Sequence, residues 1–297
     1  MVFTTADIEA PVWLPPLVAL VVSFFTSMGG VSGAFLLLPF QVSVLGYTTP
    51  SVSATNHLFN VVAIPSGVYR YVREGRMVWP LTLAVIAGTL PGVFLGAIVR
   101  VVWLPDPGPF HLFVAAVLLF IGLRLARDVL RRREGASDRG NAGETSPAKV
   151  TTATLAVLEY EFAGETHRVS MPGVFFLSLV VGVVGGIYGI GGGAIMAPFL
   201  VSFYRLPVHT VAGAALMGTF VASAAGVAFY TAIAPFFPDA TVSPDWLLGT
   251  LFGVGGMVGM YAGARCQKYV PARAIKVLLT AIILLTATKC VLDALAK

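Results

Sequence analysis

The stretch YGIGGGAIMAPF, Tyr188–Phe199, places four glycines and a proline inside an otherwise hydrophobic region. An earlier stretch, GGVSGAFLLLPF, Gly29–Phe40, combines the same residue types and also ends in Pro-Phe. Glycine and proline are the least favourable residues in a helix interior. The sequence therefore predicts two similar interruptions of regular structure within its most hydrophobic regions.

The composition indicates a membrane protein. Of the 297 residues, 57% are hydrophobic and 11% are charged, and the mean hydropathy is +0.87, whereas about 25% charged residues are usual in soluble domains. Asp, Glu, Lys and Arg are absent from Ala10–Tyr69, Met77–Val99, Val169–Tyr204, Leu206–Pro238 and Trp246–Ala264. Each tract can hold one or more segments of the ~20 apolar residues that cross a bilayer as a helix. We predict an all-α integral membrane protein, because a membrane β-barrel would alternate polar and apolar residues.

Charge and cysteine content argue against several other classes. The N-terminal segment contains Asp7 and Glu9 but no Lys or Arg, so it lacks the basic region of a signal peptide and is expected to be retained. The net charge of +5 is interpreted as orientation charge beside membrane helices rather than as a nucleic-acid-binding surface. Two cysteines, Cys266 and Cys290, predict neither a disulfide framework nor a metal site. No cofactor is expected.

The two halves of the chain are related by an internal duplication. Residues 159 positions apart match in the order Gly30/Gly189, Gly33/Gly192, Pro39/Pro198, Phe40/Phe199 and Tyr71/Tyr230. Further along, the offset becomes 167, so that Trp79 pairs with Trp246, and Gly88, Gly92 and Gly96 pair with Gly255, Gly259 and Gly263. A long ungapped register with paired tryptophans predicts two structurally similar halves. We interpret the two glycine stripes as helix-packing surfaces.

A charged segment separates the halves. Leu130–Val150 is rich in Arg, Gly and Ser and is typical of a solvated linker. The expected domains are a first membrane repeat at 1–131, a cytoplasmic linker at 132–170 and a second membrane repeat at 171–297. Thr151–Met171 alternates polar and apolar residues around a glycine, which predicts a small hairpin outside the membrane, with disorder as the alternative.

The positions of Lys and Arg orient the chain. Candidate full spans are Val52–Tyr69, Val78–Val102, His111–Leu130, Thr210–Ala232, Trp246–Ala264 and Ala274–Leu295. Arginines follow the first of these spans and fill the linker, which puts both loops in the cytoplasm, whereas Asp239 and Asp245 put Ala232–Asp245 outside. The N-terminus is therefore expected outside, in a cell membrane of the bacterial inner-membrane type.

The number of membrane crossings between these loops predicts that the glycine-rich segments are re-entrant. Both the linker and the span starting at Thr210 begin inside, so Pro172–Tyr204 must enter the membrane and return. Its two pieces, about 15 and 12 residues, are only ~18–23 Å long as helices, which is short of the ~30 Å hydrocarbon core. Trp13–Leu45 is the equivalent hairpin entering from the opposite face. Each half would then contain about five helical segments and the halves would be inverted; ten short tilted spans are the alternative.

The two glycine-rich tips predict a binding site. Non-helical backbone at membrane depth persists only where it is buried in protein or lines a cavity, and paired breaks in inverted halves mark transporter sites. Helices starting at Gly33 and Gly192 present unpaired N–H groups and the positive ends of their dipoles, which would hold an anion without a buried Lys or Arg. The candidate substrate-binding residues are Ser32, Gly33, Gln41, Thr55, Asn56, His57, Asn60, Gly191, Gly192, Gly193 and Thr219.

Other interpretations of these polar residues stay open. Ser43, Ser202 and Ser223 are further polar positions in the apolar tracts. Asn56 and Asn60 lie four residues apart on one helical face, a spacing that serves either a substrate or interhelical hydrogen bonds. His57 is the candidate for proton coupling, with a satisfied core histidine as the alternative. An intramembrane enzyme is disfavoured because the apolar tracts contain no Asp or Glu.

These pieces resemble the sulfite exporter TauE/SafE family. The resemblance is carried by GGVSGAFLLLPF with SATNHLF and by YGIGGGAIMAPF with HTVAGAALMGTF, and it spans nearly the whole chain apart from the linker. It implies a permease for small sulfur-containing or carboxylate anions, such as sulfite and organosulfonates, usually moved outward. Where the family often has Gly-Thr-Ser, this chain has Ala54-Thr55-Asn56 and Gly213-Ala214-Ala215. We therefore expect an asymmetric pocket.

The function expected from the sequence is transport of a small anion across a lipid bilayer by alternating access around the two glycine-rich tips. An anion channel is the nearest alternative. A homodimer is compatible with this interpretation, and neither a nucleic-acid partner nor a catalytic activity is expected.

Overall fold

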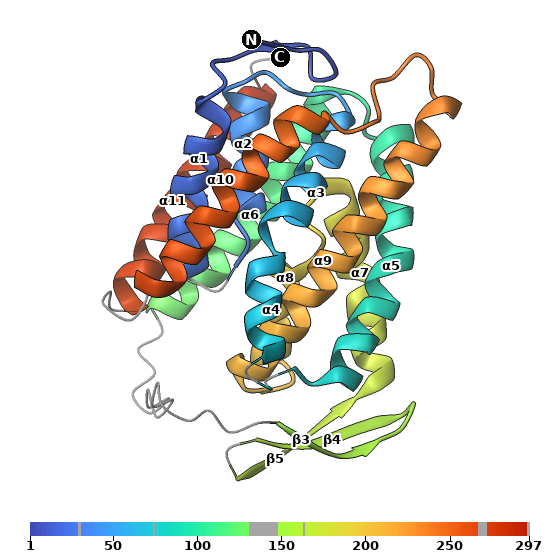
Figure 1. The fold of residues 1–297 in the computed structure, drawn as a ribbon, viewed down its shortest axis with the longest axis vertical. Coiled ribbons are helices and arrows are strands. Elements are labelled where there is room, and N and C mark those ends of the chain that lie inside the picture. The colour runs from blue at the N-terminus through green and yellow to red at the C-terminus, as the bar shows by residue number, and fades with distance from the viewer. Residues whose placement is uncertain are drawn as a thin grey trace.

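The computed structural model describes residues 1–28, 31–73, 75, 77–130, 148–162, 164–266 and 272–295. Most of them are helical (Figure 1). The helices are α1 (Leu14–Met28), α2 (Ala34–Ser43), α3 (Ser51–Ala63), α4 (Pro65–Arg73), α5 (Trp79–Val102), α6 (Pro107–Leu130), α7 (Met171–Tyr188), α8 (Gly193–Ser202), α9 (Val208–Ile233), the short 3₁₀ turn η1 (Ala234–Phe236), α10 (Trp246–Cys266) and α11 (Ala272–Leu295).

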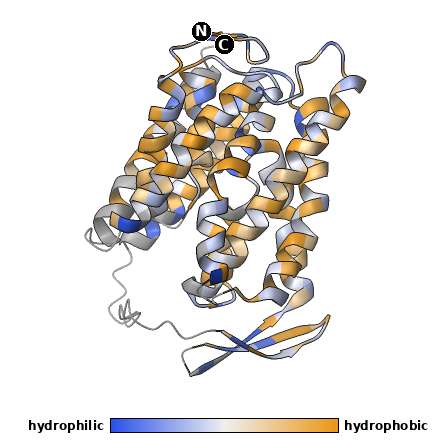
Figure 2. Cartoon of the chain, viewed as in Figure 1, coloured by the Kyte–Doolittle hydropathy of each residue, from blue (hydrophilic) through white to orange (hydrophobic). Residues whose placement is uncertain are grey.

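Five stretches of helix are long and apolar enough to cross a membrane, counting only the residues that the structure describes. They are Trp79–Val102, Pro107–Arg124, Met171–Tyr188, Thr210–Phe236 and Trp246–Gly263. Hydrophobic positions run along the helices in Figure 2. Large apolar side chains such as Leu83, Phe176 and Leu285 are more than half exposed, as expected of surfaces that face lipid rather than water. The protein is therefore a helical membrane protein.

One expected span and one segment expected to be short differ in the structure. Val52–Tyr69 was expected to be one helix, but the chain divides at Ile64 into α3 and α4. Pro65 begins α4, and it has no N–H to donate to the preceding turn. The segment before Tyr188 is also longer than expected, because α7 has 18 residues. At about 1.5 Å per residue it reaches ~27 Å, close to the thickness of the hydrocarbon core.

Two small sheets accompany the helices; the first was not expected from the sequence, and the second lies where a small hairpin was expected. Near the N-terminus, β1 (Val2–Phe3) pairs antiparallel with β2 (Ile8–Glu9). At the opposite end of the molecule in Figure 1, β3 (Lys149–Ala153), β4 (Val157–Phe162) and β5 (Glu165–Ser170) form an antiparallel sheet in that order. The small hairpin expected at Thr151–Met171 is therefore part of a three-stranded sheet.

The three-stranded sheet is attached to two membrane helices. The hydroxyl groups of Tyr160 on β4 and Thr210 on α9 form a hydrogen bond of 2.9 Å. Burial there raises the pKa of the Tyr160 hydroxyl above its ordinary value. β5 continues directly into α7, where the Ser170 side chain accepts a hydrogen bond from the Gly173 N–H and caps the helix.

The glycine stripes are contact surfaces between the halves. A Cβ atom added at Gly88, Gly92 or Gly96 of α5 would overlap the carbonyl oxygens of Phe175, Leu179 and Val183 on α7. A Cβ atom added at Gly255, Gly259 or Gly263 of α10 would overlap those of Pro16, Leu20 and Phe24 on α1. Each stripe therefore lets two helix backbones meet without side chains between them, which is the packing role expected from the sequence.

We expect the substitution Gly259→Ala to lower the stability of the folded protein by about 1–3 kcal/mol, the usual cost of overpacking. The methyl group would overlap the Leu20 carbonyl oxygen and push α1 away from α10. The matched control is Gly108→Ala on α6, where an added Cβ meets nothing within 4 Å. Thermal unfolding of the two variants in detergent measures the difference, and equal midpoints would contradict the packing role.

Candidate functional site

The second glycine-rich turn requires glycine at three positions. Gly189, which ends α7, has a φ of 80°, and Gly191 and Gly192 have φ values of 64° and 86°. Residues with side chains adopt this left-handed conformation only with strain. The first turn is built differently, since Gly33 has a φ of −65° in the right-handed region, and Gly29 and Gly30 lie outside the described residues.

The end of α7 and the start of α2 meet in the interior. The Tyr188 hydroxyl donates a hydrogen bond of 2.7 Å to the Phe35 carbonyl oxygen on α2. The Ser53 hydroxyl on α3 donates one of the same length to the Ile187 carbonyl oxygen, and a Cβ added at Gly189 would overlap the Ser53 carbonyl oxygen. Both glycine-rich regions of the chain therefore pack against the same helix, α3, and contact each other.

A hydrogen-bonded network connects these two turns. We call Ser32, His57, Asn60 and Ser223 the polar crossing, and all four side chains are buried. The Ser32 hydroxyl donates to Asn60 Oδ1 (2.6 Å), and Asn60 Nδ2 donates to the Ser223 hydroxyl (3.2 Å). His57 Nδ1 lies 3.2 Å from the same hydroxyl. Asn60 of α3 thus joins the first glycine-rich turn to Ser223 of α9, which also contacts His57.

The second glycine-rich turn reaches the same serine. A Cβ added at Gly191 would lie 2.6 Å from the Ser223 hydroxyl oxygen and 2.7 Å from the Thr219 carbonyl oxygen. Thr219 is buried beside it and donates its hydroxyl to the Ala215 carbonyl oxygen one turn earlier in α9. Gly191 therefore lets the turn backbone approach Ser223, a close approach that a larger residue would prevent.

A second polar pair supports the first turn of α2. Asn56 Nδ2 donates to the Ala34 carbonyl oxygen (3.0 Å), and Gln41 Nε2 donates to Asn56 Oδ1 (3.3 Å). The Ala34 N–H donates to the Ser32 hydroxyl (3.3 Å), which links this pair to the polar crossing. Asn56 and Gln41 thereby fix α2 against α3.

Several buried polar atoms around these groups have no hydrogen-bond partner among the described residues: Ser23 Oγ, Gln41 Oε1 and His57 Nε2. The Gly186 carbonyl oxygen, which approaches the His57 ring, accepts from the Tyr230 hydroxyl at 2.9 Å. Buried polar atoms without a partner are costly and rare. Their concentration near the two turns indicates a place where polar groups of a bound molecule can supply the missing contacts.

Not every predicted residue joins this arrangement. Thr55 belongs to a separate cluster, where its hydroxyl contacts the Tyr47 hydroxyl (2.9 Å) and accepts from the Asp245 N–H (2.9 Å). The Cβ direction of Gly33 is filled by the Ser23 hydroxyl, and that of Gly192 by Val181. Each of these two glycines thus packs against the helix that precedes its turn, Gly33 against α1 and Gly192 against α7. Gly193 is the first residue of α8.

Two buried residues were missed by the sequence analysis as site candidates. Ser223 was noted only as a polar position, although it lies one helical turn after Thr219 on the same face. Arg100 was overlooked because it directly follows the uncharged tract Met77–Val99, yet its side chain is fully buried. The expectation of an interior without Lys or Arg was therefore wrong.

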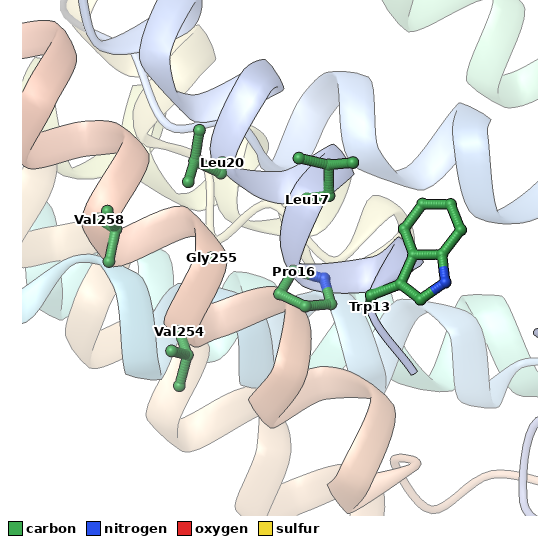
Figure 3. Close-up of a pocket in the computed structure, with 7 residues that line it drawn as sticks. All are labelled: Trp13, Pro16, Leu17, Leu20, Val254, Gly255 and Val258. Carbon is green, nitrogen blue, oxygen red and sulfur yellow. The ribbon is translucent and has the colours of Figure 1, made fainter. Parts of the chain in front are cut away.

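A groove of about 400 Å³ lies elsewhere, between α1 and α10 (Figure 3). Its lining is almost wholly apolar and comes from Trp13, Pro16, Leu17, Leu20, Val254, Gly255 and Val258. Such a surface suits hydrocarbon and offers no donors to an anion. Among the described residues, no group of three His, Cys, Asp or Glu side chains has the arrangement of a metal site.

Apolar helices long enough to cross a bilayer, packed around a buried set of hydrogen-bonded polar side chains, define a class, the polytopic helical membrane proteins. A family model described as sulfite exporter TauE/SafE matches residues 16–290. The chain therefore belongs to the TauE/SafE sulfite exporter family, and the resemblance drawn from its glycine-rich stretches is confirmed. Comparisons with curated proteins and with solved structures found no match.

The substitution Ser223→Ala is expected to destabilise the protein by about 1–3 kcal/mol, because it leaves buried hydrogen-bonding groups of Asn60 and His57 unsatisfied. Thr231→Ala on the same helix is the matched control. Its hydroxyl bonds only within α9, to the Val227 carbonyl oxygen, and surface changes usually stay within about 0.5 kcal/mol. Thermal unfolding compares the two, and an equal effect would show that Ser223 does not hold the polar crossing together.

Proposed function

We propose that this protein is a permease for small anions, of the sulfite, organosulfonate or related carboxylate type, and that the anion binds at the polar crossing. One observation carries the proposal: Ser32 of the first glycine-rich turn and Gly191 of the second both reach the Asn60–Ser223 pair. The two interruptions that distinguish the sequence therefore converge on one buried set of neutral hydrogen-bond donors.

The chemistry of the polar crossing suits an oxyanion. Hydroxyl and amide groups can donate hydrogen bonds to anionic oxygens without adding a permanent charge. In the structure these donors satisfy one another, so an entering anion has to replace their mutual contacts with its own oxygens. The first N–H groups of α2 and α8 add the positive ends of two helix dipoles near the turns. His57 is the group of the crossing through which proton coupling would act.

The proposed mechanism uses two inverted halves, with repeats at 1–131 and 171–297 and the linker at 132–170. The packing described above supports this division. Pro16, Leu20 and Phe24, which face the α10 stripe, lie 159 residues before Phe175, Leu179 and Val183, which face the α5 stripe. The duplication thus relates the α1–α10 contact to the α7–α5 contact. Each contact joins one half to the other, as a structure that alternates between two openings requires.

The arrangement of the chain also supports re-entrant hairpins and the proposed sidedness. In Figure 1 α7 rises from the end that carries the three-stranded sheet and α8 leads back toward it. α1 starts at the other end, beside the start of α10, and the loop after α2 returns there, since the Ser51 N–H bonds to the Thr241 carbonyl oxygen. This arrangement supports the proposed orientation, with the arginine-rich linker in the cytoplasm and the N-terminus outside a membrane of the bacterial inner-membrane type. Outward transport is proposed from membership of the sulfite exporter family.

The test places a negative charge in the polar crossing without changing its size. Asn60→Asp keeps the shape of the side chain and adds a carboxylate, which repels an anion in a low-dielectric interior. Asn60→Ala removes the same hydrogen bonds and adds no charge. Uptake of radiolabelled sulfite by liposomes containing each full-length variant is expected to fall at least about tenfold further for Asn60→Asp than for Asn60→Ala.

Two controls complete this experiment. Gel filtration in detergent confirms that both variants are folded before reconstitution. Trans-stimulation by unlabelled sulfite separates a transporter, which shows exchange, from an anion channel, which does not. Equal uptake by both Asn60 variants would place the anion elsewhere, and wild-type liposomes that take up neither sulfite nor an organosulfonate would overturn the proposed substrate class.

A further inference from the structure

Arg100 lies in the last turn of α5, where no carboxylate of the described residues forms an ion pair with it. Of the side chains whose burial is described, the fully buried charged groups are Arg100 and, nearly so, Asp245. The Asp245 carboxylate accepts hydrogen bonds from the N–H groups of Ala6 and Leu248. Asp245 is therefore satisfied by backbone groups and not by Arg100. A guanidinium buried without a carboxylate is unfavourable in any protein and more so beside a membrane.

The hydrogen bonds of Arg100 use only some of its N–H donors. Its Nη2 donates to the Thr48 carbonyl oxygen (2.8 Å), its Nη1 donates to the Leu104 carbonyl oxygen, and its guanidinium stacks on the Phe110 ring at 3.7 Å from the centroid. A guanidinium has five N–H donors. Nε has no partner among the described residues, and neither has the buried Thr49 hydroxyl in the adjacent loop.

A purely structural role does not account for these features. Arg100 does satisfy carbonyl groups near the C-terminal end of α5, where a positive charge is favoured. A neutral amide can donate to the same two carbonyls, however, without burying an unpaired charge. In the duplicated sequence the position 167 residues later holds Gln267, which lies outside the described residues, so the duplication does not keep a guanidinium at this position.

Arg100 also lies close to an aromatic residue that packs near the polar crossing. Ala97 and Val101, which flank it on α5, pack in one cluster with Tyr230 of α9. The Tyr230 ring in turn lies 6.2 Å from the His57 ring, and its hydroxyl donates to the Gly186 carbonyl oxygen in α7. One aromatic residue thus separates the neighbourhood of the buried guanidinium from His57.

We propose that Arg100 is a second anion-binding residue, which holds the substrate between the N-terminal face and the polar crossing. This inference rests on the proposed function. The planar guanidinium fork matches two oxygens of an oxyanion, and the Coulomb attraction doubles for a doubly charged ion. Arg100 therefore favours sulfite dianion over a singly charged alkylsulfonate, whereas the neutral polar crossing distinguishes their charges less.

Isothermal titration of the purified full-length protein tests this selectivity at an alkaline pH where sulfite is a dianion, with ethanesulfonate as the monoanion. R100Q is expected to raise the Kd for sulfite at least about tenfold and to raise the Kd for ethanesulfonate much less. R100K, which keeps a point charge but loses the fork, is expected to recover most of the lost selectivity. Phe110→Leu is the structural control: it removes the ring beneath the guanidinium, lowers the melting temperature and leaves the ratio of the two Kd values unchanged.

A measurement on the wild-type protein does not depend on how the variants fold. Phenylglyoxal modifies accessible arginines during transport, and mass spectrometry of peptides reports each site. Sulfite is expected to protect Arg100 but not Arg168, whose side chain on β5 is 71% exposed. Unchanged selectivity in R100Q, or equal modification of Arg100 with and without sulfite, overturns the inference alone. Wild-type protein that binds neither anion overturns the proposed function and this inference with it.

Discussion

Within a bilayer, each polar group has to find its hydrogen-bond partner inside the protein, because lipid offers none. This constraint organises the interior of the protein. The side chains of Ser32, Asn60 and Ser223 bond to one another and are buried together. Where the helical pattern is interrupted before α8, the turn is enclosed by α3 and α9 rather than exposed. A buried polar atom that has no partner in such a setting can form a hydrogen bond with a complementary group of a bound solute.

The second organising feature is the absence of side chains between paired helices. The stripes on α5 and α10 bring glycine α-carbons against the carbonyl oxygens of α7 and α1. Close backbone contact of this kind depends on dispersion and shape rather than on hydrophobic transfer, which has little driving force between helices in lipid. At these two contacts the halves therefore meet through backbone rather than through interdigitated side chains.

The sequence predicted those features that depend on composition and periodicity. The hydrophobic tracts, the glycine stripes and the grouping of Asn56, His57 and Asn60 all follow from residue types at helical spacing, and the structure shows each of them. The break at Pro65 was missed because a proline within an apolar run is compatible with a kinked membrane helix. Which glycines need a left-handed backbone, at 189, 191 and 192, depends on how the turn packs, and spacing alone carries no such information.

Long-range contacts explain the remaining differences. Ser223 belongs to the polar crossing through its hydrogen bond with Asn60, which lies more than 160 positions earlier in the chain. No local pattern in the sequence predicts that pairing. In the sequence, Arg100 stands at the end of an uncharged span, as an interfacial residue would. Its burial comes from Thr48, Leu104 and Phe110, which pack around it only in the folded protein. The strand β3 adds to the expected hairpin through pairing with β4, which alternation within a single segment cannot reveal.

The pairing of α1 with α10 has a consequence for biosynthesis. The carbonyl oxygens of Pro16, Leu20 and Phe24 pack against glycines that the ribosome adds more than 200 residues later. At roughly 5–20 residues per second, α1 waits for its partner for on the order of ten seconds or more. During that interval the face of α1 that later contacts α10 has to be sheltered by lipid or by the insertion machinery. The order of assembly is thus set by the carboxyl-terminal half, and the native packing of the first helix is among the last to form.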